Sequence, residues 1–306
     1  MKPTKTILCC TWLLFTTCLH LNSYAQTAEE WFKCGNDEGI TYVRALQHRY
    51  HNKYTSRINC YTKAIELGYK PLYSAYFGRG YLNNKEGNYK QALTDYQKVI
   101  ELQPLLLDAF FHIGDVNYYL KNYQEAIENY QTGIDKVQIK YGNCAYSYQT
   151  YIAYTSIGLA QHQLKKYQEA CDAYTQAIIC NENNHPAYNN RGISKDALGL
   201  YQEAIADYDK AIALDSGYAL AYNNRGISKS NLGLYDEAIL DFTKAIKLRV
   251  KLDWITYNNR GYAYFKAGNY KEALADWDTM QRLIPYDCTP QYRYREEACE
   301  KLLDEK

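Results

Sequence analysis

Side chains that could do chemistry are sparse in this 306-residue chain and do not gather into a catalytic constellation. His48 and His51 are three residues apart, which places two imidazoles on one face of a helix, but no third ligand follows at a spacing that completes a metal site. We find no phosphate-binding glycine loop, nucleophile elbow, zinc-protease pattern or isolated carboxylate pair. The sequence therefore predicts a protein that is not an enzyme and that has no metal and no cofactor.

The first 25 residues have the pattern of a secretory signal peptide. Lys2 and Lys5 precede an apolar run at 7–21, and small residues then lead to Gln26. A membrane anchor is the alternative, but a membrane span needs about 20 predominantly apolar residues, and this run contains threonines and a histidine. We expect residues 1–25 to direct export to the periplasm or the extracellular space, with membrane association left open.

Charge and cysteine content narrow the class of protein further. The formal net charge is +1, so the chain lacks the strong positive field that nucleic-acid binding requires. Three of the ten cysteines precede Gln26, which leaves seven in the exported chain, an odd number with no CxxC pair. Disulfides persist in the oxidising compartments that exported proteins reach, and at least one of the seven cysteines has no partner within the chain.

One phrase recurs in the second half of the chain, as AYNNRGISK at 187–195 and 221–229 and as TYNNRGYAY at 256–264. Its glycines are 34 and 35 residues apart, and the spacing continues towards the N-terminus apart from an insertion of ten residues. Numbering each unit so that this glycine is eighth gives six units in one frame, and such self-similarity predicts a repeat solenoid. The eighth-position glycines are Gly80, Gly114, Gly158, Gly192, Gly226 and Gly261.

Further columns of this frame describe two helices in each unit. The fourth, seventeenth and twenty-fourth positions are aromatic in all six units, and Gly199 suits a left-handed helix end between the two halves of its unit. A glycine inside a helix costs about 1 kcal/mol relative to alanine, so the eighth position needs a packing reason, which we take to be close approach of the two helices. The twentieth position is always alanine, as Ala92, Ala126, Ala170, Ala204, Ala238 and Ala273.

These columns resemble the tetratricopeptide repeat, a helix-turn-helix unit of 34 residues. The resemblance implies an all-α fold in which the units stack as a right-handed superhelical solenoid. The chain departs from the family pattern in two ways. The usual proline at position thirty-two survives only as Pro104 and Pro285, and a weaker first unit has Ala45 and Arg57 where the glycine and alanine belong.

The frame gives the following expected organisation. A solenoid of about seven repeats spans 26–287 and is interrupted near 139–150, and residues 288–306 form a C-terminal capping helix with Tyr294 and Ala298 on its apolar side. The expected repeats are 38–72 (degenerate), 73–106, 107–140, 151–184, 185–218, 219–253 and 254–287.

Two columns carry opposite charges. Arginine occupies the seventh position in four units, and the same four units have aspartate at the twenty-third position. A buried charge that loses its partner costs roughly 3–5 kcal/mol, so this joint presence predicts a partly buried ion pair between the two helices of a repeat. Solvated charges copied by repeat duplication are the alternative. The pairs are Arg79 with Asp95, Arg191 with Asp207, Arg225 with Asp241, and Arg260 with Asp276.

The resemblance also implies where a partner binds, because positions two, five, six, nine, twelve and thirteen line the concave surface in the family. Asparagines recur at positions five and six, and an amide can both donate to and accept from the backbone of an extended peptide. Hydrogen bonds to neighbouring groups within the fold are the alternative. The asparagines are Asn189, Asn190, Asn223, Asn224, Asn258 and Asn259, and the aromatic residues expected on the same surface of earlier units are Phe77, Tyr81, Phe111, Tyr118 and Tyr119.

Together these features predict an exported, non-enzymatic scaffold that binds an extended peptide segment of a protein partner in a concave groove. A module that binds glycans or cell wall through the groove aromatics is the alternative. We expect no nucleic-acid partner and no small-molecule cofactor, and an envelope complex is compatible with export.

Overall fold

The computed structural model describes residues 27–36, 54–141, 148–248, 254–283 and 292–304, and these residues form α-helices and no strand. The all-α fold expected from the sequence is confirmed for this part of the chain. The proposed signal peptide at 1–25 and the pair His48 and His51 lie outside the described residues.

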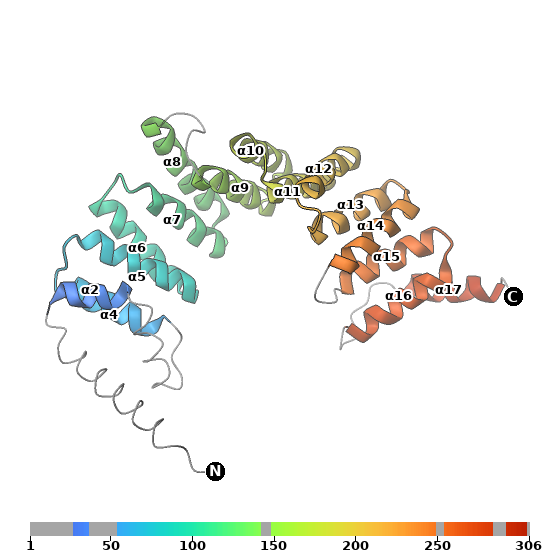
Figure 1. Cartoon of the computed structure of the whole chain (residues 1–306), viewed down its shortest axis with the longest axis horizontal. Coiled ribbons are helices and arrows are strands. Elements are labelled where there is room, and N and C mark those ends of the chain that lie inside the picture. The colour runs from blue at the N-terminus through green and yellow to red at the C-terminus, as the bar shows by residue number, and fades with distance from the viewer. Residues whose placement is uncertain (1–26, 37–53, 142–147, 249–253, 284–291, 305–306) are drawn as a thin grey trace, which may run out of the picture. The chain divides into compact units, whose positions relative to one another are not determined.

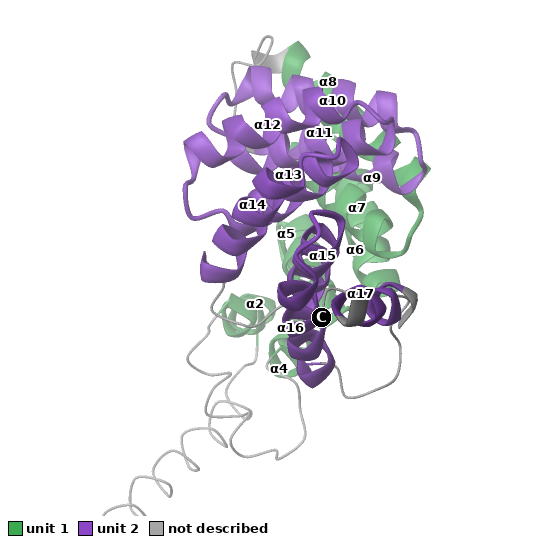
Figure 2. Cartoon of the chain, turned by 90° about the vertical axis from the view of Figure 1, so that its right-hand side faces the viewer, with its two compact units in different colours: residues 1–143 green, residues 144–306 purple. Residues whose placement is uncertain are grey.

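The chain divides into two compact units, residues 1–143 (unit 1) and 144–306 (unit 2), which are coloured separately in Figure 2. The division falls within the expected insertion. Unit 1 contains α2 (Ala28–Asn36), α4 (Thr55–Glu66), α5 (Leu72–Glu86), α6 (Tyr89–Leu102), α7 (Leu107–Tyr119) and α8 (Tyr123–Tyr141).

Unit 2 continues the same alternation of paired helices (Figure 1). Its helices are α9 (Tyr148–Gln163), α10 (Tyr167–Cys180), α11 (His185–Ala197), α12 (Tyr201–Leu214), α13 (Ala219–Asn231), α14 (Tyr235–Leu248), α15 (Trp254–Lys266), α16 (Tyr270–Leu283) and α17 (Tyr292–Asp304). In both units we call the first helix of each repeat the A helix and the second the B helix.

A residue with a left-handed backbone conformation lies between the A helix and the B helix. Gly199 has φ 77° between α11 and α12, and Gly87, Gly233 and Gly268 do the same elsewhere. Lys121 and Lys165 adopt this conformation, with φ 64° and 61°, in the two repeats that lack the glycine. The short turn that follows sets the B helix beside its A helix.

The eighth-position glycine makes room for the aromatic ring at position twenty-four. A Cβ added to Gly192 would lie 2.6 Å from Tyr208, and one added to Gly261 would lie 2.7 Å from Trp277. Real Cβ atoms do not approach so closely, so any other residue would push the A and B helices of the repeat apart. The glycine at position eight therefore leaves room for a buried aromatic ring, and this explains why a glycine recurs inside the A helix.

The first helix pair differs from the repeat expected at 38–72. The helix that packs on α4 is α2, and a Cβ on Gly35 would lie 2.7 Å from the Tyr61 ring. Gly35 therefore takes the role assigned to Ala45, which lies outside the described residues. The helix that pairs with α4 thus lies earlier in the chain than the repeat frame predicts, because Gly35 is 45 residues before Gly80. A disulfide between Cys34 and Cys60 joins α2 to α4.

The insertion and the C-terminal segment both extend helical structure. The B helix α8 has 19 residues where α6 and α10 have 14, and α9 begins three residues before the position at which the repeat frame starts. Residues 142–147, between them, lie outside the described part. At the end of unit 2, α17 packs on α16, with Ala298 buried in a cluster that contains Phe265 and Trp277.

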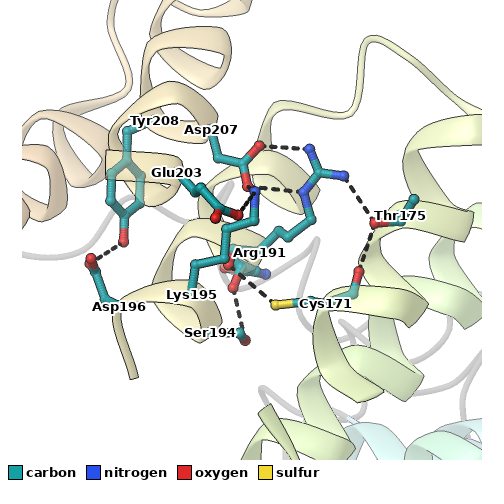
Figure 3. Close-up of polar contacts among 10 residues, drawn as sticks. Cys171, Thr175, Arg191, Ser194, Lys195, Asp196, Glu203, Asp207 and Tyr208 are labelled. Carbon is teal, nitrogen blue, oxygen red and sulfur yellow. Dashed lines mark hydrogen bonds and ion pairs between the residues drawn. The ribbon is translucent and has the colours of Figure 1, made fainter. Parts of the chain in front are cut away.

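The paired charges form buried bridges, and each arginine also reaches a third helix. Figure 3 shows this arrangement at Arg191. Arg191 of α11 donates from Nε and Nη2 to the two carboxylate oxygens of Asp207 of α12, at 2.9 and 2.6 Å. Its Nη1 donates to Thr175 Oγ1 of α10, in the preceding repeat, at 3.0 Å. The guanidinium also lies over the Tyr188 ring, 5.5 Å from the centroid. One side chain thus joins two helices of its own repeat to the repeat before it, and we call this arrangement the arginine clamp.

The clamp is present in four repeats. The side chains of Asp95, Asp207, Asp241 and Asp276 are at most 8% exposed, so each carboxylate depends on its arginine for compensation. In two repeats a lysine at position eleven also pairs with the aspartate, Lys195 with Asp207 and Lys229 with Asp241. The third-helix acceptors are Thr62 for Arg79, Thr175 for Arg191, Asp209 for Arg225 and Thr243 for Arg260.

The clamp predicts strong coupling between Arg225 and Asp241. Each single change to alanine leaves a charge with poorer compensation and should lower the free energy of unfolding by about 3 kcal/mol. The double variant should lose about 1–3 kcal/mol less than the sum, because neither charge is then left without the other. Chemical denaturation followed by circular dichroism measures the cycle. The exposed pair Lys98 and Glu101 is the control and should give additive effects, whereas additivity at Arg225 and Asp241 would refute the clamp.

Candidate functional site

The A helices of unit 2 form one layer, in which each A helix contacts the next. Residues three and four apart on a helix lie on the same face, so positions two, five, six and nine of one A helix form a continuous surface with those of its neighbours. We call this surface, on α9, α11, α13 and α15, the A face of unit 2. It contains all six of the asparagines that the sequence singled out.

Five of those asparagines form a hydrogen-bonded chain that crosses three repeats. Asn259 Nδ2 of α15 donates to Asn223 Oδ1 of α13 at 3.4 Å, and Asn223 Nδ2 donates to its neighbour Asn224 at 3.4 Å. Asn224 Nδ2 then donates to Asn189 Oδ1 of α11 at 3.0 Å, and Asn189 Nδ2 donates to Asn190 at 3.2 Å. These amides therefore join the A helices of three successive repeats.

The five asparagines of the hydrogen-bonded chain differ in exposure. Asn189 and Asn223, at position five, are 2% and 7% exposed, so they are enclosed by the neighbouring A helix and are not displayed to a ligand. This differs from the placement implied by the family, and the reason is that each accepts a hydrogen bond from position six of the following repeat. Asn190, Asn224 and Asn259 are partly exposed, and each has an amide hydrogen that the chain does not use.

Two further hydrogen bonds join neighbouring A helices beside the asparagines. In the first, Ser228 Oγ of α13 donates to Asp196 of α11 at 2.7 Å. The same carboxylate also accepts a hydrogen bond from Tyr208 OH of the B helix α12, at 2.7 Å. Burial raises the pKa of Asp196, and the two hydroxyl donors oppose that rise. His162 Nδ1 of α9 lies 3.0 Å from Ser194 Oγ of α11, and burial lowers the pKa of this histidine. Apart from Tyr208, which belongs to the aromatic column, none of these residues stood out in the sequence, although positions ten and twelve are polar in successive repeats.

Apolar side chains flank the row of amides. Leu220 and Ile255, at position two of α13 and α15, are 46% and 45% exposed. Ile152 occupies the same position of α9 and is also exposed, while Ile193 and Ile227, at position nine, are half-buried on the other side of the row. The A face of unit 2 is thus a line of amides between two aliphatic lines.

Of the five aromatic residues expected on the A helices of unit 1, one is buried, two are half-buried and two are exposed. Phe111 is buried against Gly133, Phe77 packs edge-on against Tyr96, and Tyr118 is half-buried. Tyr81 and Tyr119 are exposed, and Tyr119 stacks on Tyr89 at a centroid distance of 5.1 Å. The rings are needed for packing between helices, which leaves few of them open to a ligand.

Chemistry beyond hydrogen bonding has little support in the described residues. Among them, no group of three or more histidine, cysteine, aspartate or glutamate side chains is arranged to hold a metal ion. Cys171 is buried in α10, where burial raises the pKa of its thiol and so opposes formation of a reactive thiolate. The arrangement on the A face of unit 2 is suited to binding a polar backbone flanked by apolar side chains.

The amide chain predicts that Asn224 contributes to stability. Changing Asn224 to alanine leaves Asn189 Oδ1 buried without its donor, which costs about 1–2 kcal/mol, and the better helix propensity of alanine returns up to ~0.7 kcal/mol. We expect a net loss of about 1 kcal/mol in the free energy of unfolding, measured by urea denaturation. Asn231→Ala, at the exposed end of the same helix, is the control and should cause no loss. Equal stability of Asn224→Ala and the parent protein would show that the amide chain contributes nothing to the fold.

Comparison with known proteins identifies the repeat. Models described as tetratricopeptide repeat match residues 73–104, 111–185, 185–218, 219–250 and 254–287, which together cover more than half of the chain. No curated protein matches the sequence at a significant level. Proteins of this fold are generally scaffolds for protein interaction and not enzymes.

Solved structures show the same fold. A tetratricopeptide repeat protein from Parabacteroides merdae is 16% identical over 91% of this chain and 99% of its own, with a TM-score of 0.60. PilW, a type IV pilus biogenesis factor, is 16% identical over 74% of this chain and 98% of its own, with a TM-score of 0.60. MamA is 26% identical over 57% of this chain and 91% of its own, with a TM-score of 0.50. Repeat period, helix pairing and family models agree, and the chain belongs to the tetratricopeptide repeat family.

Proposed function

We propose that this protein is an exported scaffold that holds an extended peptide segment of a partner protein on the A face of unit 2. The observation that carries the proposal is the row of partly exposed amides of Asn190, Asn224 and Asn259 between the aliphatic lines that contain Leu220 and Ile255. An extended peptide presents backbone groups and side chains in alternation, and this surface offers amides for the former and apolar contacts for the latter.

The fixed orientation of the amides supports the proposal. Because Asn224 and Asn259 each donate one hydrogen bond to the preceding repeat, their side chains are held in place before a ligand arrives. A peptide that binds them loses less conformational freedom in the protein than it would on a row of mobile side chains. The enclosed amides of Asn189 and Asn223 act as supports in this proposal, and the partly exposed amides contact the peptide.

Export is proposed on two features. Residues 1–25 have the pattern of a signal peptide, and Cys34 is disulfide-bonded to Cys60, a pairing that persists in oxidising compartments. Among the described helices, none is both long enough and apolar enough to span a bilayer. We propose a periplasmic or extracellular location, and a complex in the cell envelope is compatible with it.

Binding of glycans is the weaker proposal. Sugar binding by stacking needs open aromatic faces, and of the five aromatic residues expected to supply them only Tyr81 and Tyr119 are exposed. Tyr119 also has one face covered by Tyr89. We therefore favour a peptide ligand.

Site-specific photo-crosslinking in the native envelope tests the peptide proposal. A photoreactive benzoylphenylalanine is placed at Leu220 or Ile255 on the A face, or at Leu240 on B helix α14 as the control, since all three side chains are exposed. We expect one partner protein to be captured from positions 220 and 255, with the crosslink mapped to an extended segment of that partner, and no capture from position 240.

Two results would contradict the proposal. Equal capture at all three positions would mean that the A face has no specific role. Binding on a glycan array together with no protein crosslink at 220 or 255 would favour the glycan-binding alternative.

A further inference from the structure

One repeat of unit 1 lacks the arginine clamp but keeps the space around it. In the repeat of α11 and α12, five positions build the clamp with its surrounding charges. They are Arg191 and Lys195 on α11, Asp207 and Glu203 on α12, and Thr175 on the preceding B helix. Figure 3 shows these side chains converging between the helices.

The repeat of α7 and α8 has different residues at four of the same five positions. The arginine is replaced by isoleucine and the lysine by asparagine, so both cations are missing, whereas the glutamate is retained. In the order arginine, lysine, aspartate, glutamate and third-helix hydroxyl, the residues are Ile113, Asn117, Asn129, Glu125 and Gln97.

A cavity of about 560 Å³ lies where the clamp would be. Leu93, Ile100 and Ile113 supply its apolar lining, from α6 and α7. The residues at all five positions line it too, so the cavity has three side-chain amides, from Gln97, Asn117 and Asn129. An aliphatic stem could lie on the apolar part while a polar head reaches the amide oxygens.

The charges of the cavity favour a cation. Glu101 and Glu125 are its two ionisable lining residues, and no lysine or arginine lines it. Glu101 pairs with Lys98, whereas no described residue forms an ion pair with the Glu125 carboxylate. In two other repeats the glutamate at this position pairs with the lysine at position eleven, as Glu237 does with Lys229 at 3.3 Å. Glu125 has no such lysine, because position eleven of its repeat is Asn117.

We propose that this cavity between α6, α7 and α8 binds the side chain of an arginine presented by a partner protein, at the place that the arginine of the clamp occupies in other repeats. The guanidinium donates to the amide oxygens and to Glu125, and the three aliphatic residues hold the methylene stem. The surface is separate from the A face of unit 2, so this site stands or falls independently of the peptide proposal.

A titration with small probes tests the site. The full protein, labelled with ¹³C at isoleucine methyl groups, is titrated with N-acetyl-arginine methylamide and, separately, with the citrulline analogue, which has nearly the same shape and no charge. We expect the methyl signals of Ile100 and Ile113 to shift with the arginine probe, less at high salt, and to stay unchanged with the citrulline probe at equal concentration.

Two variants separate binding from changes in fold. Glu125→Gln should weaken binding of the arginine probe about three- to tenfold, and Glu128→Gln, on the same helix with its carboxylate bonded to Gln124, should leave it unchanged. The combined change Ile113→Arg and Asn129→Asp rebuilds an internal clamp and should abolish binding. Equal shifts with both probes, shifts confined to other isoleucines, no shift at any concentration, or unchanged binding by Glu125→Gln would each overturn the proposal.

Discussion

Buried ion pairs join the repeats of this protein, and in each of them the arginine links side chains from three helices. An aspartate with almost no exposed surface, such as Asp207, needs a buried counter-charge, and Arg191 provides it by donating to both carboxylate oxygens. The same guanidinium then bonds to the preceding repeat through Thr175, so the charge that holds one helix pair together also fixes its neighbour. Loss of either partner leaves a charge in a poorly solvated place, which is why the two columns appear and disappear together.

The recurring glycines, aromatic residues and asparagines act together with this ion pair. Glycine at position eight seats the aromatic ring of position twenty-four and brings the two helices of a repeat into contact. That contact puts Arg225 within reach of Asp241, and the clamp then sets the spacing at which Asn224 of one A helix meets Asn189 of the previous one. The proposed peptide surface thus depends on packing behind it. The cavity beside Ile113 is the counterpart, since the repeat of α7 and α8 has no clamp and has a space at that place.

Much of this could be predicted from the sequence, and the failures have physical reasons. The period, the helix pair and the Arg–Asp bridges follow from columns within one repeat, where each residue type has one packing role. The hydrogen-bond acceptor on the third helix, Thr175 or its equivalent, was not predicted because it belongs to the previous repeat. The acceptors nevertheless occupy the same position in each repeat. Burial of Asn189 was missed because the sequence does not show how closely the next A helix approaches. The first A helix was missed because the insertion that follows Gly35 puts it out of frame.

Native-state hydrogen exchange of an Arg225→Met variant tests the three-helix clamp most directly. Methionine keeps an apolar stem in place of the arginine and removes the charge, so the packing changes little while the bonds to Asp241 and Asp209 are lost. We predict that amides in α12, α13 and α14 all lose protection, by at least about tenfold, while α9 and α10 keep theirs. Loss of protection confined to α13, or no loss at all, would show that the arginine does not couple consecutive repeats.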